Sequence, residues 1–320
     1  MRSPLFFSFF WKILIKAFAS LAPSSKPLKN RFFQWPGPTT IERPAIAPSL
    51  GGAALAVTTL LASPLALAQA PGNPGLTELI NVAASQRMLS QRIAKAYFYL
   101  GNRIRISESR RQLHGALRAF KSNLNMLQEQ AQSPSVKELL AFAAFAFEEY
   151  DDLSRRPYTK ENGALVLDLS ETLLEVSNEV VQRLQEQTNH MGSKLIDLAG
   201  RQRMLAQRIA KYYIAYQAGF RDSNSVHQLK DAVASFEKNL KVLKQSPENS
   251  PATEQVLEKI ERQWRIIRRF FLDIEKGGIP AMVMVAADRI TELSDQVTKL
   301  HLQKQRQPTP MPSTKAIPSR

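Results

Sequence analysis

The sequence predicts an all-α fold made of two tandem antiparallel four-helix bundles. Apolar residues recur three and four positions apart along most of the chain after residue 76, the spacing of helices that bury one face. No convincing alternation of apolar and polar residues, the pattern of a strand, occurs. A third observation sets the number of bundles, because one eleven-residue segment occurs twice, 116 positions apart.

This repeat extends well beyond the segment that defines it. Residues 85–95 read SQRMLSQRIAK and residues 201–211 read RQRMLAQRIAK, so nine of eleven positions are identical. Further matching stretches are 116–127 with 232–243 at the same offset, and 175–180 with 292–297 one residue later in register. The duplication therefore spans nearly everything after the N-terminal region, and we expect module 1 at residues 69–190 and module 2 at residues 191–304.

Each copy is expected to contain four helices, separated by residues that end helices. The expected ranges are 76–100, 108–130, 135–154 and 164–190 in the first copy, and 193–218, 225–245, 253–275 and 280–303 in the second. Gly and Pro mark the breaks, as at Ser133-Pro134, Ser246-Pro247 and Gly277-Gly278. Between the copies only Gly192 interrupts the pattern, so we expect one long continuous helix to join the bundles. The proline-rich tail, residues 305–320, is expected to be disordered.

Residues 1–68 have the composition of a targeting region with a long N-terminal extension. After Arg43 comes an apolar run at 50–62, followed by Ala66-Leu67-Ala68, and these are the parts of a secretory signal. We therefore expect a periplasmic or secreted protein, cleaved before Gln69. The alternative is a membrane anchor formed by the N-terminal apolar stretch at 5–21.

Composition narrows the classes of function. The net charge is +15, but the basic residues are scattered over the helices and interleaved with Glu and Asp, so we expect no nucleic-acid partner. Cys is absent, and the four His residues are neither close together nor repeated between the copies, so we expect no metal site and place these histidines on helix surfaces. No phosphate-binding loop or hydrolase motif occurs. The sequence predicts a non-enzymatic protein with no catalytic residues and no cofactor.

The most informative positions are two arginines. Arg87 and Arg203 interrupt a stripe of small residues at the same place in each copy, and such a stripe lets another helix approach closely. A buried arginine is costly unless it is paired. Three partners remain open: a carboxylate of a neighbouring helix, backbone carbonyls, or a small anion from solvent. Periodicity alone favours the carboxylate, with Glu175 and Glu292 as candidates.

Other charged residues of the repeated segment lie toward the polar side of the same helix. They are Arg92, Lys95, Arg208 and Lys211. We expect these four side chains to be exposed to solvent.

At residues 199–208, AGRQRMLAQR, the chain resembles the signature of the PilJ/NarX-like sensor module. That module occurs at the N-terminus of type IV pilus chemotaxis transducers and in periplasmic parts of nitrate/nitrite sensor kinases. In the nitrate-sensing members, the resemblance implies a four-helix bundle in which the arginine before the motif methionine meets its symmetry mate, with the anion between them. The matching residues here are Arg87 and Arg203, and Gln86 and Gln202 are expected to support them.

Two functions remain open. The first is an exported sensory module that binds a small ligand, such as nitrate or nitrite, between Arg87 and Arg203. The second is a structural or protein-interaction scaffold related to pilus or chemosensory receptors, without a small ligand. No kinase or transducer segment follows the second copy, so we expect a membrane sensor or another protein as partner. The sequence does not indicate an oligomeric state.

Overall fold

The computed structural model describes residues 74–187 and 193–306, and all regular structure within them is helical. The first copy contains α2 (Pro74–Gly101), α3 (Ile106–Gln130), α4 (Pro134–Arg155) and α5 (Lys160–Gln185). The second contains α6 (Ser193–Gln217), α7 (Ser223–Lys244), α8 (Pro251–Leu272), the 3-10 turn η1 (Ile274–Lys276) and α9 (Pro280–Arg306). The predicted all-α class is confirmed, and most predicted helix bounds agree within a few residues.

Local chemistry explains most of these bounds. Thr159, Asp222 and Ser250 accept hydrogen bonds from backbone N–H groups at the starts of α5, α7 and α8. Proline opens α4, α8 and α9, where its missing N–H costs nothing. Beyond α6 and η1, Gly219 and Gly277 adopt positive φ angles of 95° and 74°, which glycine reaches without strain.

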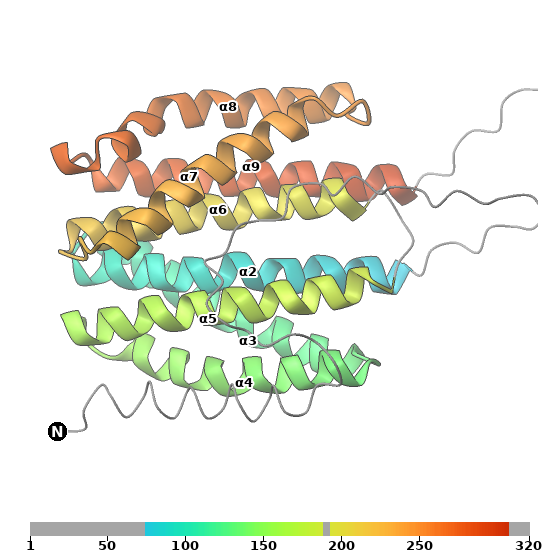
Figure 1. The fold of residues 1–320 in the computed structure, drawn as a ribbon, viewed down its shortest axis with the longest axis horizontal. Helices are drawn as coiled ribbons and strands as arrows, with labels where there is room; N and C mark the ends of the chain where they lie inside the picture. Colours follow the sequence, from blue (N-terminus) through green and yellow to red (C-terminus); the bar gives the residue numbers. More distant parts are fainter. Residues whose placement is uncertain (1–73, 188–192, 307–320) are drawn as a thin grey trace, which may run out of the picture. The chain divides into compact units, whose positions relative to one another are not determined.

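The helices form two antiparallel bundles that share a central layer (Figure 1). Helices α3, α4 and α5 lie on one side of α2, whereas α7, α8 and α9 lie on the other side of α6. Between the bundles, α2 packs along α6 more extensively than any other pair of helices. The repeated segment thus lies at the centre of the described structure in both copies.

The duplication is also visible in the packing of the cores. Phe120 stacks on Phe147 with ring centroids 4.6 Å apart, and Phe236 packs on Trp264 with centroids 4.3 Å apart at equivalent positions. Each pair joins the third helix of its bundle to the second. The two bundles are therefore repeats in three dimensions as well as in sequence.

The expected continuous helix between the copies is not formed. Helix α5 ends at Gln185 and α6 begins at Ser193. Glu171 on α5 contacts Arg208 on α6, whereas Asn178, later on α5, shares a partner with Asp197, earlier on α6. The two helices therefore run in opposite directions. The physical reason is that α6 buries its small-residue stripe against α2 of the first copy, which a straight continuation of α5 would not permit.

Several expectations fall on parts of the chain outside the described residues. These are the targeting region at 1–68, residues 188–192 of the expected joining helix, and the tail from 307 onward. Helix α9 extends to Arg306, two residues into the expected tail. Among the helices that are described, none combines the length and apolar character needed to span a bilayer.

The close approach of α2 and α6 requires a small residue at position 200, which is glycine in this chain. A Cβ atom built there would lie 3.5 Å from Nη2 of both Arg87 and Arg203, and 3.6 Å from Cβ of Ala84. Ala84 is the equivalent residue of the first copy. A methyl group therefore fits in ordinary contact, whereas a larger side chain has to displace the two guanidinium groups or Ala84.

We predict that Gly200→Ala leaves the fold intact and stabilises it by up to about 1 kcal/mol, through helix propensity. Gly200→Leu should instead cost roughly 1–3 kcal/mol, because the helices must separate. Denaturant unfolding measures both free energies. Gly115→Ala is the matched control, since nothing lies within 4 Å of a Cβ built at that helical position. Equal stability of the Gly200→Ala and Gly200→Leu proteins would contradict the close contact.

Candidate functional site: the arginine interface

The two motif arginines meet at the centre of the contact between α2 and α6. The side chain of Arg87 is 1% exposed and that of Arg203 is 5% exposed. Both guanidinium groups approach the same backbone position, Gly200. We call this region, with the side chains that pair with the two arginines, the arginine interface.

Arg87 is neutralised by the second copy. It donates a hydrogen bond to Asp197 on α6 at 2.7 Å, and a second one to the side-chain oxygen of Asn178 on α5 at 3.3 Å. Asp197 also accepts from Arg201 at 2.6 Å, one turn later on α6. This carboxylate therefore lies between two arginines, one on each motif helix.

Arg203 is neutralised by its own copy. It donates to Asp295 on α9 at 2.7 Å, and to the side-chain oxygen of Asn81 on α2 at 3.2 Å. Asp295 also pairs with Lys299 at 2.8 Å. Each arginine thus faces one carboxylate and one amide.

These partners occupy equivalent positions in the two copies. Asn81 corresponds to Asp197 at the offset of 116, and Asn178 corresponds to Asp295 at the offset of 117. The first copy therefore contributes two amides and the second contributes two carboxylates. Asp197 on α6 reaches Arg87, and Asp295 on α9 reaches Arg203. Each arginine therefore receives one negative charge.

Burial shapes the electrostatics of this interface. Desolvation lowers the pKa of Arg87 and Arg203 from the ordinary value, while the adjacent carboxylates act to raise it. For Asp197, burial acts to raise the pKa, but the attraction of Arg87 and Arg201 outweighs it and holds the pKa below its ordinary value. Arginine remains protonated in proteins, so the interface consists of ion pairs.

One nitrogen atom of each guanidinium group has no hydrogen-bond partner in the part of the chain that the structure describes. The Nε–H groups of Arg87 and Arg203 are buried and have no hydrogen-bond partner among the described residues. Unmatched buried donors are uncommon and costly. They are the only groups of the two guanidiniums without a partner in the described structure, and they occur in both copies.

The expected carboxylate partners were the wrong ones. Glu175 and Glu292 are both exposed, and Glu292 pairs instead with Arg289 at 3.0 Å. For Arg203 the carboxylate is Asp295, three residues after Glu292 on α9; on α5 the equivalent residue is the amide Asn178, and the carboxylate of Arg87 is Asp197 on α6. Residues three apart differ by only about 60° around a helix, so Glu175 and Glu292 lie beside Asn178 and Asp295 but are turned further toward solvent.

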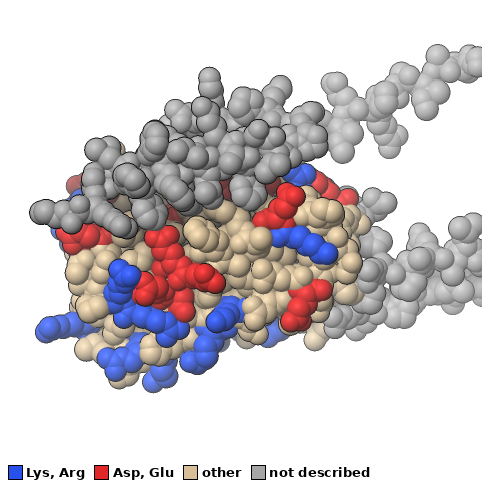
Figure 2. Space-filling view, turned by 90° about the horizontal axis from the view of Figure 1, so that it is seen from below, with Lys and Arg blue, Asp and Glu red and all other residues tan. Residues whose placement is uncertain are grey.

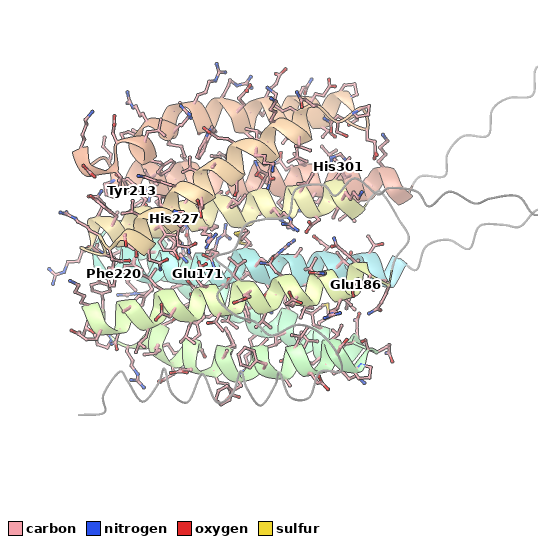
Figure 3. All side chains as sticks on the ribbon, in the orientation of Figure 1. Glu171, Glu186, Tyr213, Phe220, His227 and His301 are labelled. Atoms are coloured by element: carbon pink, nitrogen blue, oxygen red, sulfur yellow. The ribbon has the colours of Figure 1, made fainter. Side chains whose placement is uncertain are left out.

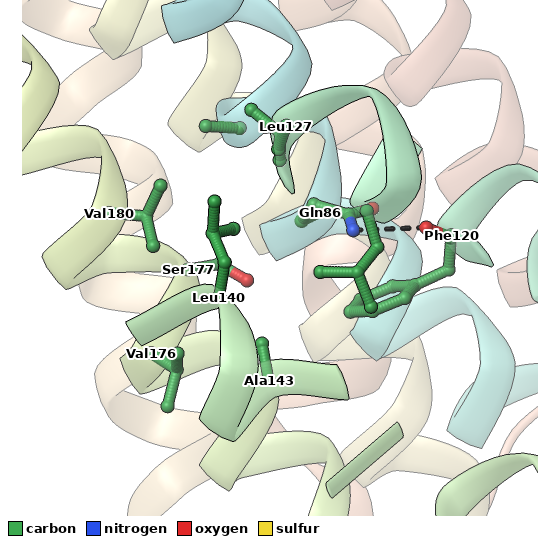
Figure 4. Close-up of a pocket in the computed structure, with 10 residues that line it drawn as sticks. Gln86, Phe120, Leu127, Leu140, Ala143, Val176, Ser177 and Val180 are labelled. Atoms are coloured by element: carbon green, nitrogen blue, oxygen red, sulfur yellow. Dashed lines mark hydrogen bonds between the residues drawn. The ribbon is translucent and has the colours of Figure 1, made fainter. Parts of the chain in front are cut away.

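The two glutamines do not join the arginines. Gln86 donates to the carbonyl of Phe120 at 3.0 Å, and Gln202 donates to the carbonyl of Phe236 at 3.3 Å, so both point into their own bundles. Beside Gln86 lies a cavity of about 10 Å³, lined by apolar residues and Ser177 (Figure 4). That volume holds about one water molecule. It is too small for an oxyanion.

Two further ion-pair networks cross between the copies. Lys95 on α2 pairs with Asp288 on α9, and Lys211 on α6 pairs with Glu171 on α5. Both lysine side chains are fully buried. Asp288 and Glu171 are equivalent positions at the offset of 117, so each motif lysine reaches the last helix of the other copy. Glu171 lies where α5 meets the central layer (Figure 3).

These networks correct the expectation that the other motif charges are exposed to solvent. Arg208 is buried and binds Glu171 together with Lys211, and Gln228 accepts from Arg208 at 2.6 Å. In the other network, Gln112, the equivalent of Gln228, donates to Asp288 at 2.6 Å. The signal was present in the sequence, because lysine, arginine and acid recur together in both copies.

The histidines form no site in the described residues. His114 and His227 are exposed, as expected, but His301 is buried on α9 (Figure 3), and His190 lies outside the described residues. Burial lowers the pKa of His301. No cluster of metal-ligating side chains occurs in the part of the chain that the structure describes.

The network around Glu171 makes stability depend on pH. Burial alone would raise the pKa of Glu171, but the attraction of Arg208 and Lys211 and their hydrogen bonds lower it from 4.5 to about 2. A carboxyl whose pKa is lowered by folding stabilises the native state above its unfolded pKa. That contribution is lost as the pH falls from about 4.5 toward 2.

We predict that Glu171→Gln lowers the free energy of unfolding at pH 7 by about 3–5 kcal/mol, because Lys211 and Arg208 lose their counter-charge. It should also flatten the loss of stability between about pH 4.5 and 2. Urea unfolding at a series of pH values measures both effects. Glu179→Gln, an exposed residue of the same helix, should change neither. An unchanged acid profile in Glu171→Gln would contradict the crossed network.

Comparison with known proteins agrees with the motif. Residues 72–153 and 185–297 match the family model described as Type IV pili methyl-accepting chemotaxis transducer N-term. The two segments cover more than half of the chain and coincide with the two copies. No curated protein and no solved structure matches this chain. The chain therefore belongs to the family of type IV pilus methyl-accepting chemotaxis transducer N-terminal domains, which it carries as two tandem copies.

Proposed function

We propose that this protein is a non-enzymatic sensory module whose two copies act together as the two subunits of a receptor dimer would. In this proposal the motif arginines are held by the protein's own carboxylates, and the output is contact with another protein. The observation that carries the proposal is that Arg87 and Arg203, both buried, each pair with one carboxylate of the protein at 2.7 Å. The interface then has a fixed arrangement that needs no bound ligand.

Charge balance favours internal carboxylates over a bound anion. Two buried arginines already face Asp197 and Asp295, so an added oxyanion would bring a negative charge without a matching cation. Such a charge is expensive in a buried site. An anion would have to displace one of the two carboxylates in order to bind the pair.

One observation favours the alternative function, binding of a small oxyanion such as nitrate or nitrite. The two unpartnered Nε–H groups are donors that an anion or a water molecule satisfies. Arg87 and Arg203 would then be the contacting residues. Gln86 and Gln202 would have no part in that site, because they donate into their own bundles.

We further propose that the protein acts outside the cytoplasm. The support is the signal-like sequence before Gln69 and the family, which is named for the N-terminal domains of chemotaxis transducers. A membrane sensor, or another protein of the same system, is the partner that this family suggests.

The test is thermal unfolding of the full chain with nitrate, nitrite, sulfate or phosphate at constant ionic strength. We predict no selective shift in the wild-type Tm. Asp197→Asn should lower the Tm by roughly 6–12 °C, since removing one partner of a buried pair costs about 3–5 kcal/mol. Anions should restore part of that loss, because they replace the missing charge beside Arg87.

The chain offers a matched control for this test. Asn178→Asp in the Asp197→Asn background returns one carboxylate to Arg87, now from α5, and should recover stability without any anion. If the wild-type Tm rises selectively with one anion and Arg87→Ala abolishes the rise, the anion-binding function is correct and our proposal is wrong.

A further inference from the structure

The two copies differ in charge at one pair of equivalent places, the second halves of α4 and α8. Both helices contain 22 residues and begin with proline, at Pro134 and Pro251. Phe147 and Trp264 pack on equivalent aromatic rings, Phe120 and Phe236. The residues of α4 and α8 therefore align in sequence at an offset of 117. Charges can therefore be compared position by position.

The comparison shows a complete reversal of sign. Residues 145–152 of α4 contain four acidic side chains and no basic one. Residues 262–269 of α8, the equivalent window, contain four arginines and no acid. Glu148 corresponds to Arg265, and Asp152 corresponds to Arg269. Two charges of each set are paired within their own copy, Asp151 and Asp152 with Arg155 and Arg156, and Arg262 and Arg268 with Glu258 and Glu237. The remaining charges, Glu148 and Glu149 on α4 and Arg265 and Arg269 on α8, still differ in sign between the copies.

Apolar residues accompany both surfaces. On α4, Phe145 is 59% exposed, the largest exposed fraction among the large apolar side chains of the described residues. Beside the arginines, a groove of about 390 Å³ runs between α8 and α9. Ile266, Met282 and Val285 line it and are 51%, 39% and 49% exposed, and Arg105 stands at its edge. Exposed apolar residues next to charge of one sign are typical of a protein-binding surface.

The two surfaces lie on opposite sides of the described structure. Helix α4 is the outermost helix of one bundle and α8 is outermost in the other (Figure 1). Figure 2, seen from the α4 side, shows a group of acidic side chains on the visible part of that face, with basic side chains beside them and along one edge. A single chain cannot bring these two surfaces together.

We propose that the occupant of the α8/α9 groove is a second copy of this chain, docked through the acidic surface of its α4. Phe145 would enter the groove, and Glu148 of α4 would face Arg265 of α8. Glu148 and Arg265 form no ion pair within the described residues, so both are available for this contact. Because the two surfaces differ, the contact is head-to-tail and leaves a free surface at each end, which permits further growth.

The first test is sedimentation velocity of the full chain at increasing protein concentration. Species larger than a monomer should form in about 0.1 M salt and shrink in about 1 M salt, because salt screens the facing charges. A monomer at every concentration in low salt would overturn the proposal.

The second test uses two variants that each lack one surface. Phe145→Ala/Glu148→Gln/Asp152→Asn removes the acidic surface, and Arg265→Gln/Arg269→Gln removes the basic one. All these side chains are exposed, so folding should be unaffected. Each variant alone should stay monomeric. Mixed together they should form a 1:1 dimer that grows no further, since only one compatible pair of surfaces remains.

A control separates this contact from a general effect of charge. Arg118→Gln/Arg183→Gln removes two exposed arginines outside α8 and should associate like the wild type. If either surface variant still forms large species, or if the mixture stays monomeric, the assembly uses another surface and the proposal is wrong. None of these outcomes depends on the arginine interface, so the proposed function is tested separately.

Discussion

The described structure depends on one constraint: a guanidinium group cannot stay inside a helix contact without a negative charge beside it. Arg87 and Arg203 occupy a face otherwise made of small residues, so α2 and α6 approach closely only where each arginine meets a carboxylate. Asp197 and Asp295 meet this requirement. The contacts of Arg87 with Asp197 and of Arg203 with Asn81 join α2 to α6 in one register, whereas Asp295 holds Arg203 from α9. The reversal of the chain between α5 and α6 and the shared central layer are consistent with the same pairing.

The helices were predictable because their signals are local. The spacing of apolar residues, the capping side chains and the positions of Gly and Pro are each read within one or two helical turns. These local signals placed most helix bounds within a few residues. The position of the two arginines on a packing face was predictable for the same reason. Their partners were not, because periodicity assigns a residue to a face of its own helix without saying which helix lies opposite. Choosing Glu175 and Glu292 by their equivalence selected the right helix for Arg203, whose carboxylate Asp295 lies three residues after Glu292, but the wrong helix for Arg87, whose carboxylate Asp197 is on α6.

The crossed lysine networks were missed for a related reason. Lys95 and Lys211 lie near the polar side of their helices, where exposure to solvent is the ordinary expectation. What buries them is the other copy, whose last helix covers this side and supplies the acid. Both copies contain the motif lysine and an acid at equivalent positions, 171 and 288. If a pseudo-two-fold axis relates the copies, each lysine can reach the acid of the other copy. Within a single copy, that contact is not visible.

The crossing of these ion pairs affects how the chain reaches its native state. The first copy leaves the ribosome before the second, and at that stage Lys95 and Arg87 have no carboxylate of their own to pair with. Two buried cations of the first bundle therefore lack their counter-charges until α6 and α9 have been synthesised and have folded against it. Folding and unfolding should involve both copies as one cooperative unit, although the sequence reads as two domains. Two chains that exchanged second copies would satisfy every one of these pairs equally well, so the same feature that unites the halves also opens a route to domain swapping.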